Sequence, residues 1–258
     1  MTTDPSNEWD AGAYDAGHSF VYEAAADLVE LLDPSPTDRV LDVGCGTGGL
    51  TRQVAESGAT VVGIDSAPGM VAEAREADPG LSLVRGDARA LPFARSFDAV
   101  LSNAVFYWID ADDQDDVLGE VRRVLDPGGR FVAEFGGTGN VSRVVEGVRA
   151  ALADHGFAAG NPWYFPTVGE YTTRLERHGF EVRSARLFDR PTRLDGGDEG
   201  LRNWLDLFGD EFFEGLPPAE REDVLDDVED RLREDRFDGD AWVADYRRLR
   251  FVAVAVDD

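Results

Sequence analysis

Residues 40–51 read VLDVGCGTGGLT. A short apolar run contains an acid and leads into four glycines within six positions, after which a helical pattern begins. Two spacings fit the same letters, because Gly44, Gly46 and Gly49 give G-x-G-x-x-G whereas Gly44, Gly46 and Gly48 give G-x-G-x-G. The first is typical of dinucleotide-binding turns, and the second belongs to another class of nucleoside cofactor. The rest of the chain must decide between them.

The composition bounds the class of protein. The chain has 258 residues, enough for one α/β domain with an appended part. It carries 52 acidic and 25 basic residues, a net charge of −27, and every basic residue is arginine. Acids spread along a chain keep it hydrated when salt screens charges beyond about 3 Å at 1 M. The composition resembles that of halophilic archaeal proteins and predicts a high-salt cytoplasm; the alternative is that the acidity repels nucleic acid or attracts a cationic partner.

Several partners are not expected. Nucleic acid binding depends on clustered Lys and Arg, and the one short basic cluster, residues 247–250, is too small. Cys45 is the single cysteine, which excludes an intrachain disulfide and a multi-cysteine metal site. No stretch approaches the ~20 apolar residues of a membrane span, and the first residues lack the pattern of a signal peptide. We expect a cytoplasmic, reduced monomer or homodimer that holds no metal.

Strands and helices alternate across residues 39–135. Apolar runs predict strands at 39–43, 61–64, 81–85, 97–102 and 130–135, and helical spacing predicts helices at 20–32, 50–56, 68–77 and 114–125. This alternation predicts a Rossmann-like, doubly wound α/β sheet. Ser66 is placed to cap the helix at 68–77.

After residue 135 the pattern changes. The sequence predicts helices at 141–155 and 169–178, a strand at 181–187, an acidic helical region at 198–236 and a closing strand at 249–256. We expect one domain made of an N-terminal helical cover (1–38), a cofactor-binding core (39–135), the C-terminal half of the sheet (136–195), a helical insertion (196–246) and a closing strand (247–258). The insertion is interpreted as a lid over the ligand edge.

Polar residues of the first half follow predicted strands. Asp65, Asp87 and Asn103 come at strand ends, and ligands of an open α/β sheet bind outside the carboxyl ends of its strands. Asp65 lies 21 residues after Gly44, where a carboxylate can accept two hydrogen bonds from a ribose diol. Turn and acid together predict a nucleoside cofactor, although each acid has an alternative role in a turn or helix cap.

Five ordered segments carry a family resemblance. LDVGCGTG at 41–48, GID at 63–65, GDARALPF at 86–93, FDAVLSNAVFYWI at 97–109 and LDPGGRFV at 125–132 resemble the class I S-adenosylmethionine-dependent methyltransferases. The flanking segments WDAGAYDAGHSFVYEAA and NPWYFP are similar to a subgroup related to trans-aconitate methyltransferase. The resemblance implies a seven-stranded sheet whose last strand is antiparallel. It also implies S-adenosylmethionine as cofactor and S-adenosylhomocysteine as product.

The resemblance further implies cofactor contacts. Gly44, Gly46 and Gly48 would line the methionine part, with Asp42 helping to hold its ammonium, and Asp65 would bind the ribose hydroxyls. Ser66 and Met70 would flank the ribose and adenine, Asp87 and the Ala88 N–H would bind the adenine, and Asn103 would lie beside the methionyl chain.

The acceptor side is less specific. Methyl transfer mainly requires alignment of nucleophile, methyl and sulfur, and only a hydroxyl acceptor needs a general base. His18 is the candidate base or substrate ligand, Tyr14 a candidate wall beside the sulfonium, and Trp9 lies in the same segment. Phe106, Trp108, Trp163 and Tyr164 would shape the acceptor pocket, with core packing as the alternative. Arginines at 190, 193, 247, 248 and 250 are candidates to clamp a carboxylate, unless they pair with surface acids.

The sequence thus predicts an S-adenosylmethionine-dependent methyltransferase of a small molecule, with O-methylation of a carboxylate as the first hypothesis. The alternatives are a C- or N-methyltransferase of a metabolite, a nucleoside-binding NAD-type oxidoreductase, and a non-catalytic protein that binds S-adenosylmethionine. The acidic run at 110–116 lacks the glycine and distal glutamate of a calcium loop, so no metal is expected there.

Overall fold

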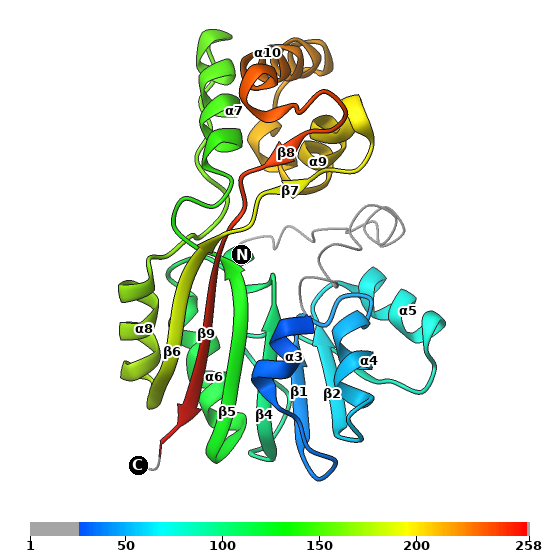
Figure 1. Ribbon diagram of the computed structural model, residues 1–258, viewed down its shortest axis with the longest axis vertical. Helices are drawn as coiled ribbons and strands as arrows, with labels where there is room; N and C mark the ends of the chain where they lie inside the picture. Colours follow the sequence, from blue (N-terminus) through cyan, green and yellow to red (C-terminus); the bar gives the residue numbers. More distant parts are fainter. Residues whose placement is uncertain (1–25, 257–258) are drawn as a thin grey trace.

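A computed structural model describes residues 26–256. Seven strands form one sheet in the order β3-β2-β1-β4-β5-β9-β6 (Figure 1). They are β1 (Arg39–Val43), β2 (Thr60–Asp65), β3 (Ser82–Arg85), β4 (Phe97–Asn103), β5 (Leu125–Gly136), β6 (Phe180–Asp189) and β9 (Arg247–Ala255). Strand β9 runs antiparallel between β5 and β6, and the other neighbouring pairs are parallel. The predicted doubly wound sheet with an antiparallel last strand is confirmed.

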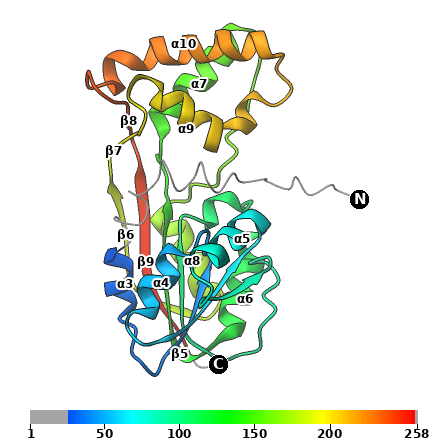
Figure 2. The ribbon, with the colours of Figure 1, turned by 90° about the vertical axis from the view of Figure 1, so that its right-hand side faces the viewer.

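Helices cover both faces of the sheet centre (Figure 2). α3 (Ala26–Leu32) and α4 (Gly49–Ala55) pack on one face, and α6 (Gln114–Val124) and α8 (Val168–Arg177) pack on the other. Val40 and Leu41, successive residues of β1, therefore point into two different cores. Burial on both faces explains why the central strands read as continuous apolar runs. α5 (Pro68–Ala77) packs beside β2 and β3.

Two local predictions are wrong. β5 begins at Leu125 rather than at residue 130, because Leu125 pairs with Phe97 before the register shifts. Gly128, with a φ of 77°, allows the backbone to bulge there without ending the strand. Ser66 does not cap α5, since the N-cap is Ala67. The backbone N–H of Ala67 instead donates to the Asp65 carboxylate at 2.9 Å.

A second layer, the lid, lies beyond the carboxyl ends of the parallel strands (Figures 1 and 2). It contains α7 (Ser142–Asp154), α9 (Gly200–Phe208), α10 (Pro218–Arg236), the short strands β7 (Thr192–Arg193) and β8 (Val243–Ala244), and the 3-10 turns η2 (Gly197–Glu199) and η3 (Asp210–Phe213). A further 3-10 turn, η1 (Phe106–Trp108), follows β4. Within residues 26–256, no helix is long and apolar enough to span a bilayer.

The lid is larger than predicted. α7 was expected with the C-terminal half of the sheet, but its apolar face packs against α9 and α10. Val144 and Val148 of α7 share a buried cluster with Leu205 of α9 and Val228 of α10. The predicted boundary at 196 is corrected accordingly, because hydrophobic burial joins α7 to helices that follow about 50 residues later.

Candidate functional site

The glycine-rich turn joins β1 to α4 at the carboxyl edge of the sheet. Gly44, Gly46 and Gly48 have φ angles of 74°, 53° and 82°, whereas Gly49 is the first residue of α4. Residues with a Cβ rarely adopt such positive φ angles. The positions that require glycine for a positive φ are therefore those of the G-x-G-x-G spacing and not those of G-x-G-x-x-G.

The three glycines differ in their surroundings. A Cβ on Gly44 would lie 2.0 Å from Cγ2 of Val105, and one on Gly48 would lie 2.9 Å from Cδ1 of Leu81. A Cβ on Gly46 would have no atom within 4 Å among the described residues. Gly44 and Gly48 thus allow close packing, whereas Gly46 borders open space where a ligand can approach the backbone.

Asp65 ends β2 beside this turn. Its Oδ2 accepts a hydrogen bond from the Gly46 N–H at 2.9 Å, and its Oδ1 accepts one from the Ala67 N–H at 2.9 Å. Burial raises the pKa of Asp65, while the hydrogen bonds from backbone N–H groups lower it. Each carboxylate oxygen keeps a further lone pair. Asp65 can therefore hold the turn and still accept hydrogen bonds from a diol.

Asp42 lies below the turn in β1 and is 1% exposed. Its Oδ2 accepts a hydrogen bond from the Thr51 hydroxyl at 2.6 Å. Burial raises the pKa of Asp42 to about 6, and the charge of Asp65 also raises it. Two carboxylates in a partly buried region create a negative potential that favours a cationic ligand. The ammonium and sulfonium of S-adenosylmethionine fit this requirement.

The predicted adenine-side residues border the same edge. Met70 is buried in α5, Ser66 is exposed, and Ala88 packs against the main core. The Asp87 carboxylate pairs with Arg89 at 2.6 Å, and this hydrogen-bonded pair lowers the pKa of Asp87. Asp87 therefore has a partner within the described part of the chain. This pairing is compatible with the alternative interpretation of Asp87 as a turn residue.

Strained backbone follows β4. Asn103 ends the strand, and Ala104 has a φ of 60° while its N–H donates to the Glu134 carbonyl at 2.7 Å. A positive φ is unfavourable for alanine and persists only where surrounding contacts fix it. Asn103 is thereby held at the edge of the sheet, three residues before the aromatic turn η1 begins at Phe106.

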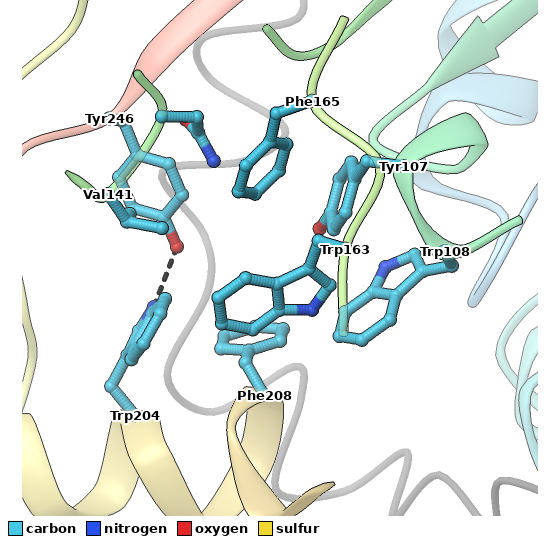
Figure 3. A pocket seen from close by; sticks show the side chains of 9 residues that line it. Tyr107, Trp108, Val141, Trp163, Phe165, Trp204, Phe208 and Tyr246 are labelled. Carbon is cyan, nitrogen blue, oxygen red and sulfur yellow. Dashed lines mark hydrogen bonds between the residues drawn. The ribbon is translucent and has the colours of Figure 1, made fainter. Parts of the chain in front are cut away.

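An aromatic pocket lies between η1 and the lid (Figure 3). It is lined by Tyr107, Trp108, Asn140, Val141, Trp163, Phe165, Trp204, Phe208 and Tyr246. Figure 3 shows Trp204 and Phe208 extending from α9 toward the rings on the sheet side. The Trp204 indole N–H donates to the Tyr246 hydroxyl at 2.7 Å, which fixes one wall of the pocket.

Two features of this pocket are unusual for core packing. The indole N–H of Trp163 is buried without a hydrogen-bond partner in the part of the chain that the structure describes. A buried donor of this kind is unfavourable until a ligand or water accepts from it. Val141 has a φ of 44°, a conformation that is rare for a β-branched residue.

Two residues predicted for the acceptor pocket lie elsewhere. Phe106 is fully buried in the main core, where its ring packs edge-on against Phe131 and Phe135. Tyr164 is not among the residues that line the pocket; it packs against the core cluster that contains Phe106, and its hydroxyl donates to Glu170 at 2.6 Å. Trp108 and Trp163 do line the pocket. Residues that are neighbours in sequence differ in this way because one side of η1, and one side of the 161–166 segment, faces the core while the other side faces the pocket.

The candidate residues Trp9, Tyr14 and His18 lie outside the described residues. His178 contacts Asp115 at 3.2 Å on the surface, in agreement with an ordinary role at the end of α8. Across residues 26–256, no three His, Cys, Asp or Glu side chains are arranged to hold a metal ion.

Sequence reasoning missed several residues of this region. Trp204, Phe208 and Tyr246 line the pocket from the lid side, and Glu134 is a buried acid of β5. An acid inside the apolar run FVAEF was the available signal for Glu134. The lid aromatics carried no such signal, because amphipathic helices also place aromatic rings in ordinary cores.

Comparisons with known proteins show the family of the chain. Residues 41–133 match the family model described as a methyltransferase domain. An uncharacterized methyltransferase of Schizosaccharomyces pombe is 38% identical over 263 residues, which cover 96% of this chain and 98% of that protein.

Solved structures share the fold. A Bacillus halodurans protein described as a methyltransferase has a TM-score of 0.64 at 17% identity, covering 91% of this chain and all of that one. Geranyl diphosphate C-methyltransferase of Streptomyces coelicolor, solved with S-adenosyl-L-homocysteine, has a TM-score of 0.55 at 17% identity. The match covers 91% of this chain and 79% of that one.

The sheet order and the family model define a class I methyltransferase fold, and the cofactor of this class is S-adenosylmethionine. The chain belongs to the methyltransferase family that the Schizosaccharomyces pombe relative represents, and it is an S-adenosylmethionine-dependent methyltransferase. The predictions of enzyme class and cofactor are confirmed, and the NAD-type alternative is not retained.

Proposed function

We propose that this methyltransferase acts on a small molecule held in the aromatic pocket. The observation that carries the proposal is the position of the pocket. Tyr107 and Trp108 follow β4 within five residues of Asn103, so the pocket lies beside the edge where the glycine turn and Asp65 are found. Ligands of this class of sheet bind at the same edge.

The cofactor contacts are part of the proposal. Gly44, Gly46 and Gly48 shape the turn against the methionine part, Asp42 faces the ammonium, and Asp65 accepts from the ribose hydroxyls. Ser66 and Met70 flank the ribose and adenine, Asp87 and Ala88 contact the adenine, and Asn103 lies beside the methionyl chain. S-adenosylmethionine, when bound, supplies an electrophilic methyl group.

The protein's contribution to chemistry is alignment and exclusion of water. Aromatic walls on both the sheet and the lid hold an acceptor in one orientation, which lowers the entropic part of the barrier. The rings also exclude water and stabilise a neighbouring cationic centre. Tyr14 is proposed as a further wall, Trp9 as a pocket residue and His18 as a substrate ligand or base.

O-methylation of a carboxylate is the proposed reaction. It is supported by the resemblance to the trans-aconitate subgroup and by the arginines that flank the lid in sequence. A carboxylate needs no general base, which agrees with a pocket lined mainly by aromatic rings. A C- or N-methyltransferase is the second candidate, since the Streptomyces coelicolor enzyme of this fold is named as a C-methyltransferase.

Isothermal titration with S-adenosylhomocysteine, and separately with NADH, in molar potassium chloride tests the cofactor site. We expect micromolar binding of S-adenosylhomocysteine alone. An acceptor screen that follows methyl transfer to candidate acids then compares wild type with Phe208→Ala. Lower turnover at unchanged cofactor affinity supports the pocket. Equal turnover of both proteins would place the acceptor elsewhere.

A further inference from the structure

Three arginines converge on one buried carboxylate at the ligand edge of the sheet. The Glu134 side chain is 0% exposed. Nη1 of Arg190 donates to its Oε1 at 2.5 Å, Nε of Arg248 donates to Oε1 at 3.3 Å, and Nε of Arg250 donates to Oε2 at 2.6 Å. One carboxylate cannot neutralise three guanidinium groups.

The other described acid of this cluster does little to restore the balance. Asp27 of α3 contacts Nη1 of Arg250 at 3.3 Å, but its side chain is 66% exposed. Burial lowers the pKa of Arg190, Glu134 raises it, and the neighbouring positive charges of Arg248 and Arg250 lower it further. An excess of buried positive charge is unexpected in a protein with a net charge of −27, and it is unfavourable unless an anion compensates it.

The cluster has unused donors. The Arg250 side chain is only 3% exposed, and its Nη2 has no hydrogen-bond partner in the described part of the chain. Arg248 uses Nε for Glu134, and its two terminal nitrogens donate to none of residues 26–256. Since both side chains bind the same carboxylate, their free N–H groups lie within one site. Unpaired buried donors favour an acceptor that carries charge.

This cluster adjoins the aromatic pocket. Arg248 lies directly opposite Gly136 in the antiparallel pairing of β9 with β5, so their side-chain directions share one face of the sheet. A Cβ on Gly136 would come within 2.6 Å of the Phe165 ring and 2.7 Å of the Asn140 amide, and both residues line the pocket. The Arg248 guanidinium also lies 5.9 Å from the centre of the Tyr246 ring.

We infer that the methyl acceptor is an organic anion with an apolar or aromatic body, and that Arg248 and Arg250 bind its carboxylate or phosphate at one end of the aromatic pocket. This inference rests on the proposed acceptor pocket and names the substrate class of that site. Planar guanidinium groups match both kinds of anion through paired N–H donors. Glu134 then acts as a positioning residue that keeps the arginines at this end of the pocket.

The test uses the full chain saturated with S-adenosylhomocysteine. Titrations compare 3-phenylpropionate, its neutral amide 3-phenylpropanamide, and phenyl phosphate. We expect at least one of the two anions to bind tenfold or more tightly than the amide, and the tighter anion identifies the acid group as carboxylate or phosphate. Arg248→Gln should remove most of this preference and leave the affinity for S-adenosylhomocysteine unchanged.

Arg193→Gln is the matched control, because it removes one positive charge from an exposed side chain that pairs with Asp238 and Asp240 outside this cluster. The inference would be overturned if wild type binds the anions and the amide equally, or if it binds none of the probes. An unchanged preference for the anion in Arg248→Gln would also overturn it. If Arg248→Gln does not fold, Arg248→Lys serves in its place. This variant keeps the positive charge but loses the planar pair of donors, so the preference for the anion over the amide should fall partly. An unchanged preference would contradict the inference.

A failure of the proposed pocket gives a different result. Phe208→Ala should weaken binding of the acid and of the amide together, because it removes a wall that contacts the apolar body. Unchanged binding of both probes in Phe208→Ala, with the anion preference intact in wild type, would reject the pocket while leaving an anion site at the arginines.

Discussion

The Asp65 carboxylate and the Gly46 N–H are joined by a hydrogen bond of 2.9 Å. The acid proposed to bind the ribose therefore also holds the glycine turn proposed to face the methionine part. Both ends of the cofactor site depend on one side chain, and a change at Asp65 affects them together.

Asp65→Ala should weaken binding of S-adenosylhomocysteine at least tenfold. Each hydrogen bond to a charged acceptor contributes about 1.5–3 kcal/mol, and every 1.4 kcal/mol changes affinity about tenfold. Isothermal titration measures the effect. Asp98→Ala is the control, since Asp98 also accepts a backbone hydrogen bond, from Arg39 at 2.8 Å, but lies where the strands begin. Unchanged affinity in Asp65→Ala would show that Asp65 is not the ribose ligand.

Asp42→Asn should make the ligand-free protein more stable. Burial raises the pKa of Asp42 from 3.8 to about 6, so the folded state binds this proton more tightly than the unfolded state does. The protonated Asp42 contributes fully to the free energy of unfolding below about pH 4, and this contribution is lost as the pH rises to about 6. At neutral pH the ionised group therefore lowers the free energy of unfolding by up to about 3 kcal/mol.

Thermal melts of Asp42→Asn and wild type between pH 4 and 8 measure this difference. The variant's advantage should grow up to pH 6 and then remain constant, reaching several degrees. Its affinity for S-adenosylhomocysteine should fall, because a neutral amide attracts the ammonium less. Asp98→Asn controls for the loss of one negative charge. A variant that melts at or below the wild-type temperature at pH 7 would contradict this account.

Gly46→Ala and Gly44→Ala should fail in different ways. Both force alanine into a positive φ, at about 1–2 kcal/mol. Gly44→Ala also places a methyl group against Val105 and should lower the melting temperature further. Gly46→Ala meets open space, so it should fold but lose at least tenfold in affinity for S-adenosylhomocysteine. Melts and titrations of both variants separate the effects; normal ligand affinity in Gly46→Ala would mean that the open space is not used by the cofactor.

Salt should stabilise the protein. With a net charge of −27, repulsion among acids destabilises the compact state, and screening shortens from about 10 Å at 0.1 M salt to about 3 Å at 1 M. Circular-dichroism melts in 0.1 M and 2 M potassium chloride should show a higher melting temperature in 2 M. The rise should shrink at pH 4, where fewer acids are ionised. A melting temperature that falls with salt would contradict a high-salt adaptation.

Strand positions were predictable because each strand is a local pattern. β1, β2 and β4 each contain an apolar run that is buried from both faces, and all three were predicted within one residue of their observed bounds. The G-x-G-x-G spacing was visible but undecided, since Gly48 and Gly49 adjoin each other. Only the φ of 82° at Gly48 and the helical start at Gly49 distinguish the two spacings.

The pocket could not be derived in the same way. Trp108, Trp163, Phe208 and Tyr246 meet across separations of up to 138 positions, and each is equally compatible with an ordinary core. Phe106 and Trp108 illustrate the difficulty, because one is a core residue and the other a pocket wall within a single turn.

The amino-acid sequence by itself determined the α/β class, the strand–turn–helix at residues 40–51 and the methyltransferase family, because these depend on periodicity, glycine and ordered local motifs. The tertiary structure alone decided that α7 belongs to the lid, that aromatic rings from four segments enclose one pocket, and that Glu134 gathers Arg190, Arg248 and Arg250. The physical reason is that hydrophobic burial and charge pairing act between groups that are close in space, and these groups come from positions far apart along the chain.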